Sequence, residues 1–166
     1  MRTVAIKVKL NSRSINAAIR KLEQEKKRIN RKLEELIQMM CNNGEEYAYQ
    51  YLTHVDTGET IASIMGYRQG THGIITVGGA AVWIEFGTGV IHNQGTDHFH
   101  DNRQELGISD WGTYGDGHGS DPNGWYYYDR NGKKRHTEGI PMEPFMQNTA
   151  ERLYEEFTKT AEKVFK

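Results

Sequence analysis

A long amphipathic segment, from Ser12 to about Met40, constrains the fold more than any other part of the sequence. Its apolar residues form a stripe that repeats every seven positions and is widened along one side: Ile15, Leu22, Ile29 and Leu36, with Ile19, Leu33 and Met40. The other positions are almost all Lys, Arg, Glu or Gln, which predicts a single long helix with a narrow apolar face. Ser12 or Ser14 is expected to cap its start, and Asn42-Asn43-Gly44 to end it.

Such a narrow stripe fits two arrangements, a coiled coil or a helix that packs on a sheet or on a neighbouring subunit. Glu25 and Lys32 occupy the positions that would share a coiled-coil seam with Ala18. Charged residues at two seam positions favour the second arrangement.

The charge of the chain is unevenly distributed. Residues 1–35 contain 11 Lys and Arg against 4 Asp and Glu, a net charge of +7, whereas residues 36–166 contain 10 against 18, a net charge of −8. A basic front and an acidic remainder are typical of charge-complementary docking between copies, or of a basic face turned toward nucleic acid. A solvated helix face explains it equally well.

Alternating apolar residues predict four strands, at residues 3–10, 64–68, 74–77 and 81–86. Short helical pieces are expected at residues 45–54 and 57–63, the second capped by Asp56. A last helix is expected from about Pro144 to Val164, with an apolar face at Ala150, Leu153, Phe157, Ala161 and Val164. The short links between residues 64 and 86 predict antiparallel neighbours.

The segment before the last helix differs in composition from the rest of the chain: residues 87–139 hold 11 of the 18 glycines. Within it, Asn131-Gly132 separates Trp125-Tyr126-Tyr127-Tyr128 from Lys133–Thr137, which is a strong hairpin signal. The predicted fold is therefore a single α+β domain over residues 1–166. An antiparallel sheet is packed by the N-terminal and C-terminal helices, and residues 88–139 form a long glycine- and aromatic-rich insert that contains a β-hairpin.

Three patterns suggest chemistry, and each has a simpler interpretation. Asp56-Thr57-Gly58 matches the aspartic protease tripeptide but lies between helical pieces, where a helix cap explains it. His92, Asp97, His98, His100 and Asp101 are potential zinc ligands without a general-base motif. The glycine-rich loop from Asp110 to Asp121 does not keep the EF-hand register. We therefore expect no catalytic residue, metal or cofactor.

Cysteine content and hydropathy bear on where the protein is made. The only cysteine, Cys41, allows no intrachain disulfide and is expected to be a packing residue. No segment has the pattern of a secretory signal or of a membrane span. Synthesis in a reducing cytoplasm and no membrane partner are expected.

Three other motifs, taken in their order along the chain, are more specific than the patterns above. They are Asp56-Thr57-Gly58, then Glu85-Phe86-Gly87-Thr88-Gly89 after Ala81-Val82-Trp83-Ile84, then Pro141-Met142-Glu143-Pro144-Phe145 before the last helix. Over residues 50–166 this order resembles the gene-product-ten-like neck or tail-completion family of siphophages and prophages. We expect the motif residues to define the fold more than to bind partners: Asp56, Gly58, Glu85, Phe86, Gly87, Thr88, Pro144 and Phe145.

The resemblance implies a structural virion protein of a tailed bacteriophage, made in the host cytoplasm. It would form a ring, six- or twelve-fold by analogy, between the head connector and the tail-tube or tail-terminator proteins, and would line the path of DNA without sequence specificity. Expected interface residues are Ile15, Leu22 and Ile29 on the helix and Trp125, Tyr126, Tyr127 and Tyr128 on the hairpin. The alternatives are a DNA-binding or packaging factor that uses the basic helix, and a metal-dependent hydrolase.

Overall fold

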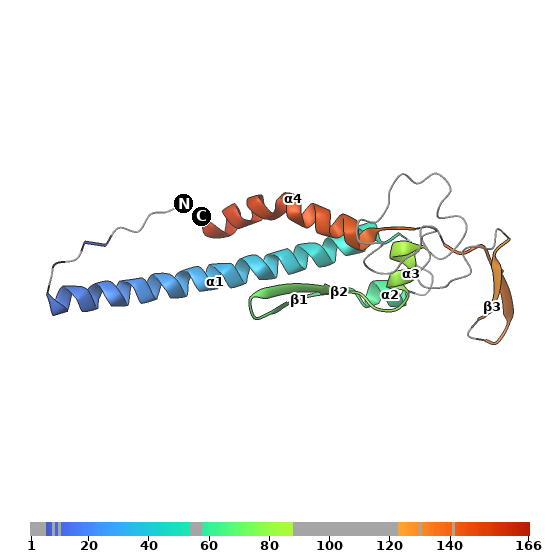
Figure 1. Cartoon of the computed structure of the whole chain (residues 1–166), viewed down its shortest axis with the longest axis horizontal. Helices are drawn as coiled ribbons and strands as arrows, with labels where there is room; N and C mark the ends of the chain where they lie inside the picture. Colours follow the sequence, from blue (N-terminus) through green and yellow to red (C-terminus); the bar gives the residue numbers. More distant parts are fainter. Residues whose placement is uncertain are drawn as a thin grey trace.

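The computed structural model describes residues 6–7, 9, 11–53, 58–87, 123–129, 131–140 and 142–166. It confirms the α+β class, with a long N-terminal helix, a C-terminal helix and small antiparallel sheets (Figure 1). The elements are α1 (Ser12–Tyr51), α2 (Glu59–Ala62), β1 (Met65–Gln69), β2 (His72–Thr76), α3 (Ala81–Phe86), β3 (Trp125–Tyr128), β4 (Lys134–Thr137) and α4 (Phe145–Phe165).

Helix α1 is longer than the sequence predicts, with 40 residues. Asn11 caps its start, not Ser12 or Ser14, since the Asn11 side chain accepts a hydrogen bond of 2.9 Å from the Ser14 backbone N–H. The predicted end at Asn42-Asn43-Gly44 is wrong, and the short helix expected at 45–54 is the last part of α1. Gly44 lies inside the helix, where β2 and α4 pack closely over it: a Cβ there would overlap Ile75 Cδ1 and lie 2.9 Å from Leu153 Cδ1.

The strands β1 and β2 form the predicted antiparallel hairpin, with Met65 opposite Thr76 and Gln69 opposite His72. The hairpin packs along α1 and lies below it in the view of Figure 1, whereas α4 lies above it. The two meet at Gly44, through Ile75 of β2 and Leu153 of α4. Two glycines allow the close approach, because a Cβ at Gly66 would overlap the Cys41 carbonyl oxygen and a Cβ at Gly73 would lie 2.9 Å from Cys41 Sγ. Cys41 is buried, as expected of a packing residue, and its thiol lies 3.2 Å from the Tyr67 carbonyl oxygen.

The strand predicted at residues 81–86 is wrong, because these residues form helix α3. Ala81, Ile84, Glu85 and Phe86 are its buried residues, and this spacing belongs to a helix. As a result the sheet next to α1 has two strands instead of three. Gly87 follows α3 with a φ of 73°, a left-handed value that glycine adopts without steric cost.

The core lies where α1, α3 and α4 meet, and its buried residues are Ala48, Leu52, Ile64, Ala81, Ile84 and Phe145. Phe145, fully buried, opens α4, and Pro144 is the N-cap residue instead of part of the first turn. The predicted apolar face of α4 is only partly correct. Val164 is buried, but Phe157 is 50% exposed, and Thr149 and Thr160 take buried positions.

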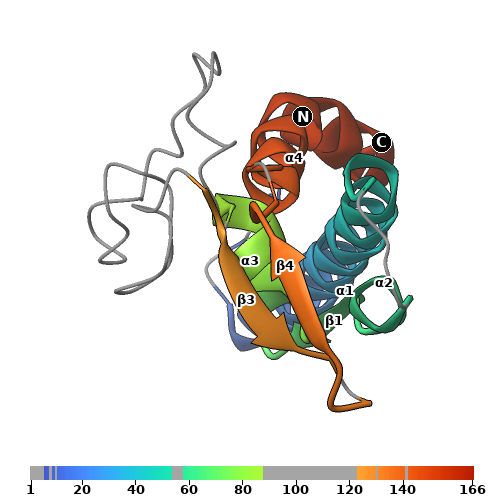
Figure 2. The same cartoon turned by 90° about the vertical axis from the view of Figure 1, so that its right-hand side faces the viewer.

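The hairpin of β3 and β4 is confirmed, with Trp125 opposite Thr137 and Tyr128 opposite Lys134. It stands at the end of the molecule beyond α3, opposite to the end from which α1 begins (Figures 1 and 2). Other predictions lie outside the described residues. These are most of the strand at 3–10, of which residues 6, 7 and 9 have no regular structure, and residues 88–122 of the insert. The short helix expected at residues 57–63 is α2, which begins at Glu59. Its N-cap residue is Gly58, with φ 76°, so the predicted cap at Asp56 is wrong.

Candidate interaction surfaces

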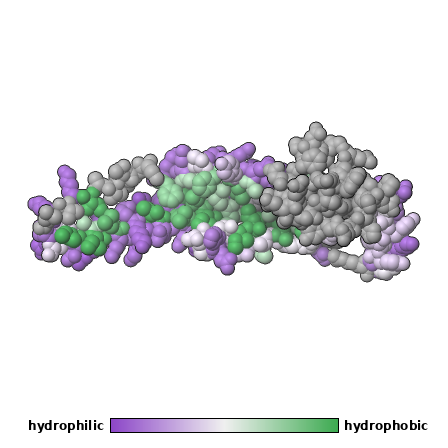
Figure 3. Space-filling view, viewed as in Figure 1, coloured by the Kyte–Doolittle hydropathy of each residue, from purple (hydrophilic) through white to green (hydrophobic). Residues whose placement is uncertain are grey.

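The first part of α1 carries an uncovered apolar stripe. Its large apolar side chains are 40–58% exposed: Ile15, Ile19, Leu22, Ile29 and Leu33. Leu36, the next member of the stripe, is only 5% exposed. Helix α1 reaches well beyond the ends of α4 and of the β1–β2 hairpin, and apolar residues gather on this projecting part (Figures 1 and 3). The predicted stripe is thus divided into a packed half and an open half.

The change from open to packed occurs between Lys32 and Leu36. The Lys32 ammonium group donates a hydrogen bond to the Val164 carbonyl oxygen and lies 5.9 Å from the centre of the Phe165 ring. Glu34 lies 3.8 Å from the Arg68 guanidinium group of β1. From this point onward, α4 and the β1–β2 hairpin flank α1.

The β3–β4 hairpin presents a second apolar surface. Tyr126, Tyr127 and Tyr128 are 64%, 44% and 72% exposed, whereas Trp125 is partly buried. Tyr126 packs edge-on against His136 with the ring centres 4.9 Å apart, and the Lys134 ammonium lies 4.4 Å above the Tyr126 ring. Because side chains alternate across a strand, Tyr126 and Tyr128 share the more open face.

The turn of this hairpin is organised by Asp129. One carboxylate oxygen accepts hydrogen bonds from the backbone N–H groups of Asn131 (3.0 Å) and Lys133 (2.9 Å), and the other accepts one from Arg135 Nε at 3.0 Å. The Lys133 N–H, and after it the Arg135 guanidinium, hold the pKa of Asp129 below its ordinary value. A fixed turn keeps the tyrosines in a defined arrangement.

Two of the sequence motifs, those around Glu85 and Phe145, meet at the start of α4. The Glu85 carboxylate accepts hydrogen bonds from the backbone N–H groups of Met146 (2.8 Å) and Gln147 (3.0 Å), so it caps α4 from another helix. The Glu143 N–H donates to the Ile84 carbonyl oxygen at 2.9 Å, and the Glu143 carboxylate accepts from the Thr53 N–H. Together with the burial of Phe145, these contacts hold α1, α3 and α4 together.

A polar cluster also fastens α4 to α1. The Arg152 guanidinium stacks 3.9 Å from the centre of the Tyr47 ring, and the Tyr47 hydroxyl donates to Glu156. Burial, and then this hydrogen bond, raise the pKa of Tyr47, while the same hydrogen bond is the main cause that lowers the pKa of Glu156. Sequence reasoning missed this cluster, because its partners lie on helices far apart in the chain.

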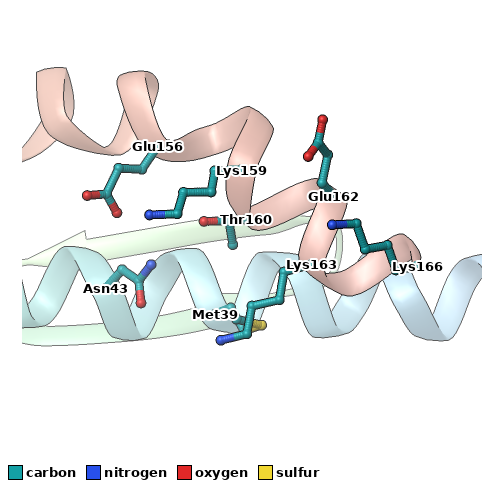
Figure 4. A pocket seen from close by; sticks show the side chains of 8 residues that line it. All are labelled: Met39, Asn43, Glu156, Lys159, Thr160, Glu162, Lys163 and Lys166. Atoms are coloured by element: carbon teal, nitrogen blue, oxygen red, sulfur yellow. The ribbon is translucent and has the colours of Figure 1, made fainter.

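An open groove of about 470 Å³ lies beside this cluster (Figure 4). It is lined by Met39 and Asn43 of α1, by Lys166 after the end of α4, and by five residues of α4: Glu156, Lys159, Thr160, Glu162 and Lys163. Its charged side chains are of both signs and spread along the helix. Within the described part of the chain, no three His, Cys, Asp or Glu residues lie close enough to hold a metal ion.

Several predicted site residues lie outside the described residues. These are Asp56, Thr88 and the potential metal ligands His92, Asp97, His98, His100 and Asp101. The structure also exposes apolar residues that the sequence reasoning did not select, above all Tyr154 at 86%. Of the helices that the structure describes, none is long and apolar enough to cross a membrane.

Comparison with known proteins identifies no relative. No protein-family model matches the chain, and no curated protein or solved structure shows significant similarity to it.

Proposed function

We propose that this chain is a structural virion protein of a tailed bacteriophage, and that it forms a homo-oligomeric ring at the head–tail junction. The ring joins the head connector to the tail and lines the DNA path. The proposal starts from the order of three motifs, around Asp56, Glu85 and Phe145, which resembles the neck and tail-completion family.

The observation that carries the proposal is the open half of the α1 stripe. Five large apolar side chains on a projecting helix stay in water in a single chain: Ile15, Ile19, Leu22, Ile29 and Leu33. Contiguous exposed apolar surface on a soluble protein usually marks an interaction site. A protein made to assemble is expected to bury such a surface against another subunit.

The hairpin supports the same role at the other end of the molecule. Tyr126 and Tyr128 are large aromatic side chains with a polar end, a type enriched in protein interfaces. A two-stranded hairpin is marginally stable by itself in water, so a neighbouring surface would stabilise it. Two separated surfaces on one elongated subunit suit an assembly in which each copy touches more than one neighbour.

The motif residues suit a different task in this proposal. Glu85, Gly87, Pro144 and Phe145 lie where α3 meets the start of α4, and Glu85 and Phe145 are buried there. Their contacts are within the chain. Motifs of this kind would preserve the shape of the subunit, while the exposed stripe and hairpin would make its contacts.

DNA binding remains the second candidate, because the open part of α1 is also basic. Its exposed cationic residues include Arg13, Arg20, Lys21, Lys27 and Arg31. A DNA-binding or packaging factor would bind duplex DNA as an isolated chain, with an affinity that falls steeply as salt rises. A ring component that only surrounds passing DNA does not require such affinity in its free form.

The test is to delete the coding sequence from the phage or prophage genome that carries it. Negative-stain microscopy is then expected to show DNA-filled heads and free tails that are not joined, and the wild-type chain supplied in trans should restore joined particles. A His98→Ala/His100→Ala chain should restore them equally well if the role is structural. Joined, infectious particles without the chain would overturn the proposal.

A further inference from the structure

The projecting half of α1 is strongly basic. Residues 12–33 contain eight Lys and Arg against two Glu, a net charge of +6. Two of the eight cations have partners within the chain, since Arg28 pairs with Glu25 at 2.8 Å and Lys32 donates to a backbone carbonyl of α4. The other six have exposed side chains and no ion pair with any residue that the structure describes: Arg13, Arg20, Lys21, Lys26, Lys27 and Arg31.

Four of these six cations form a row along the helix. Arg13, Arg20 and Lys27 are seven residues apart, and Arg31 follows four residues later. At about 100° per residue, all four lie within about 25° of one direction around the helix axis. The row is about 27 Å long at the rise of an α-helix. We call these four residues the basic row.

The basic row lies almost opposite the apolar stripe. The two directions differ by about 150° around the helix axis. Both surfaces are on the part of α1 that projects beyond α4 and the β1–β2 hairpin, so both can be reached at the same time (Figure 1). One side of this helix is therefore suited to an apolar partner and the other to an anionic one.

The positions of the charges argue against an anionic membrane as the partner. A helix that binds a bilayer buries its apolar face, and cations beside that face meet the headgroups. In this orientation the basic row would point away from the lipid. Glu23 and Glu25, at about 80° to either side of the stripe, would lie at the level of the headgroups instead.

Duplex DNA fits the row better. Its phosphates form a regular line of negative charge, which Lys and Arg side chains contact without reading the bases. Sites for single strands also use aromatic side chains that stack on bases, and residues 12–33 contain none. Residues 36–166 carry a net charge of −8, so DNA is attracted to the projecting half of α1 and repelled by the rest of the chain.

We propose that the basic row of α1 binds the phosphate backbone of duplex DNA without sequence specificity. The assignment does not depend on the ring, because it applies to either function considered above. In a packaging factor, the row itself would hold the DNA. In a ring, α1 would be the element that lines the DNA path, with the basic row toward the lumen and the apolar stripe against the wall of the assembly.

The first experiment measures binding of the full chain to a fluorescein-labelled duplex by fluorescence anisotropy. The duplex has about 30 base pairs and the salt ranges from about 50 to about 200 mM NaCl. The logarithm of the affinity is expected to fall with the logarithm of the salt concentration with a slope of about −3.6, as for four phosphate contacts. Duplexes of unrelated sequence should bind equally well.

The second experiment tests whether the row makes the contacts. Arg20→Gln/Lys27→Gln should weaken binding about tenfold or more at low salt and reduce the slope by about two. Lys21→Gln/Lys26→Gln is the matched control, because it removes the same charge from the same stretch of helix at exposed positions about 95° and 125° away from the row. Its slope should stay near that of the wild type. Circular dichroism checks that both variants remain helical.

Equal losses in the two variants would show attraction by net charge alone and overturn the proposal. So would the absence of duplex binding at about 50 mM salt. Tighter binding to polyglutamate than to the duplex would assign the row to an acidic protein, and tighter binding to vesicles of phosphatidylcholine and phosphatidylglycerol would assign it to a membrane.

The results also separate this proposal from the ring. A chain that binds the duplex through the row, but whose deletion leaves heads and tails joined, overturns the ring alone. A chain that is required for joined particles, but does not bind the duplex, overturns the role of the basic row alone.

Discussion

The carboxylate of Glu85 lies 2.8 Å from the backbone nitrogen of Met146, 61 residues further along the chain. It caps α4 at the point where helix termini leave N–H groups without partners. Pro144, at the N-cap, makes no side-chain cap hydrogen bond, so a residue of another helix performs this task. The start of α4 is thus fixed by α3, and the two sequence motifs depend on each other.

Replacing Glu85 with Ala should lower the free energy of unfolding by about 2 kcal/mol, because the Met146 and Gln147 N–H groups lose a charged acceptor. Glu85→Gln keeps one carbonyl acceptor and should cost less. Glu155→Ala, at an exposed position of α4, is the control and should change stability by less than about 0.5 kcal/mol. Urea titration followed by circular dichroism measures all three, and equal losses for Glu85→Ala and Glu155→Ala would contradict the capping role.

For Gly44→Ala, packing predicts a loss of stability, whereas helix propensity predicts a gain. Ala at an internal helix position normally gains about 1 kcal/mol over Gly. Here a Cβ would overlap Ile75 Cδ1, so overpacking should make Gly44→Ala less stable by about 1–2 kcal/mol overall.

The control for Gly44 is a double-mutant cycle with Ile75→Val, which removes the Cδ1 atom that the new methyl group would meet. The double variant should recover most of the loss caused by Gly44→Ala, measured by thermal unfolding. Additive losses in the cycle would place the strain elsewhere.

Helix α1 shows both what the sequence predicts and what it does not. The long helix, the β1–β2 hairpin and the β3–β4 hairpin were predictable, because their signals are local: a helical stripe, glycine turns and Asn131-Gly132. The end of α1 was not, since Gly44 looks like a helix stop until Ile75 and Leu153 are placed above it. A local sequence pattern does not show which distant segments will pack against it.

Helix α3 and the α1 stripe illustrate the same limit. In residues 81–86 the apolar positions 82, 84 and 86 alternate, which fits a strand. The structure instead buries residues 81, 84, 85 and 86 at a helical spacing, and Glu85 accepts a hydrogen bond from the start of α4. For the stripe, the sequence predicts the apolar face but not how far α4 extends along it. Only the placement of Val164 beside Lys32 shows which half stays open.

The β3–β4 turn should be sensitive to acid through Asp129. Hydrogen bonds from the Lys133 N–H and from Arg135 hold its folded pKa below the ordinary 3.8, so the contribution of Asp129 to hairpin stability is fully present above that value. As pH falls through the lower, folded pKa, the carboxylate is protonated and this contribution is lost.

Nuclear magnetic resonance can follow this change locally. The amide proton of Lys133 should shift with a midpoint below pH 3.8. Asp129→Asn keeps an acceptor without the charge, so it should weaken amide-exchange protection across β3–β4 at neutral pH and remove the acid transition. A midpoint above the ordinary value would contradict the hydrogen bonding of the turn.

The last prediction concerns the aromatic hairpin as an assembly surface. Deleting residues 123–137 and bridging the gap with glycines removes Trp125 and the three tyrosines from a site beyond α3, outside the core formed by Ala48, Ile84 and Phe145. The shortened chain should therefore keep its helical circular dichroism and its cooperative unfolding. If a neighbouring copy or the next ring covers the hairpin, the same chain should fail to produce joined, DNA-retaining particles when it replaces the wild type.

Tyr126→Ser/Tyr128→Ser is the milder companion variant, because it leaves the Asp129 turn in place and removes only the exposed rings. A deletion that still gives complete particles would mean that the hairpin serves its own chain as a flap, with no part in the contacts between subunits.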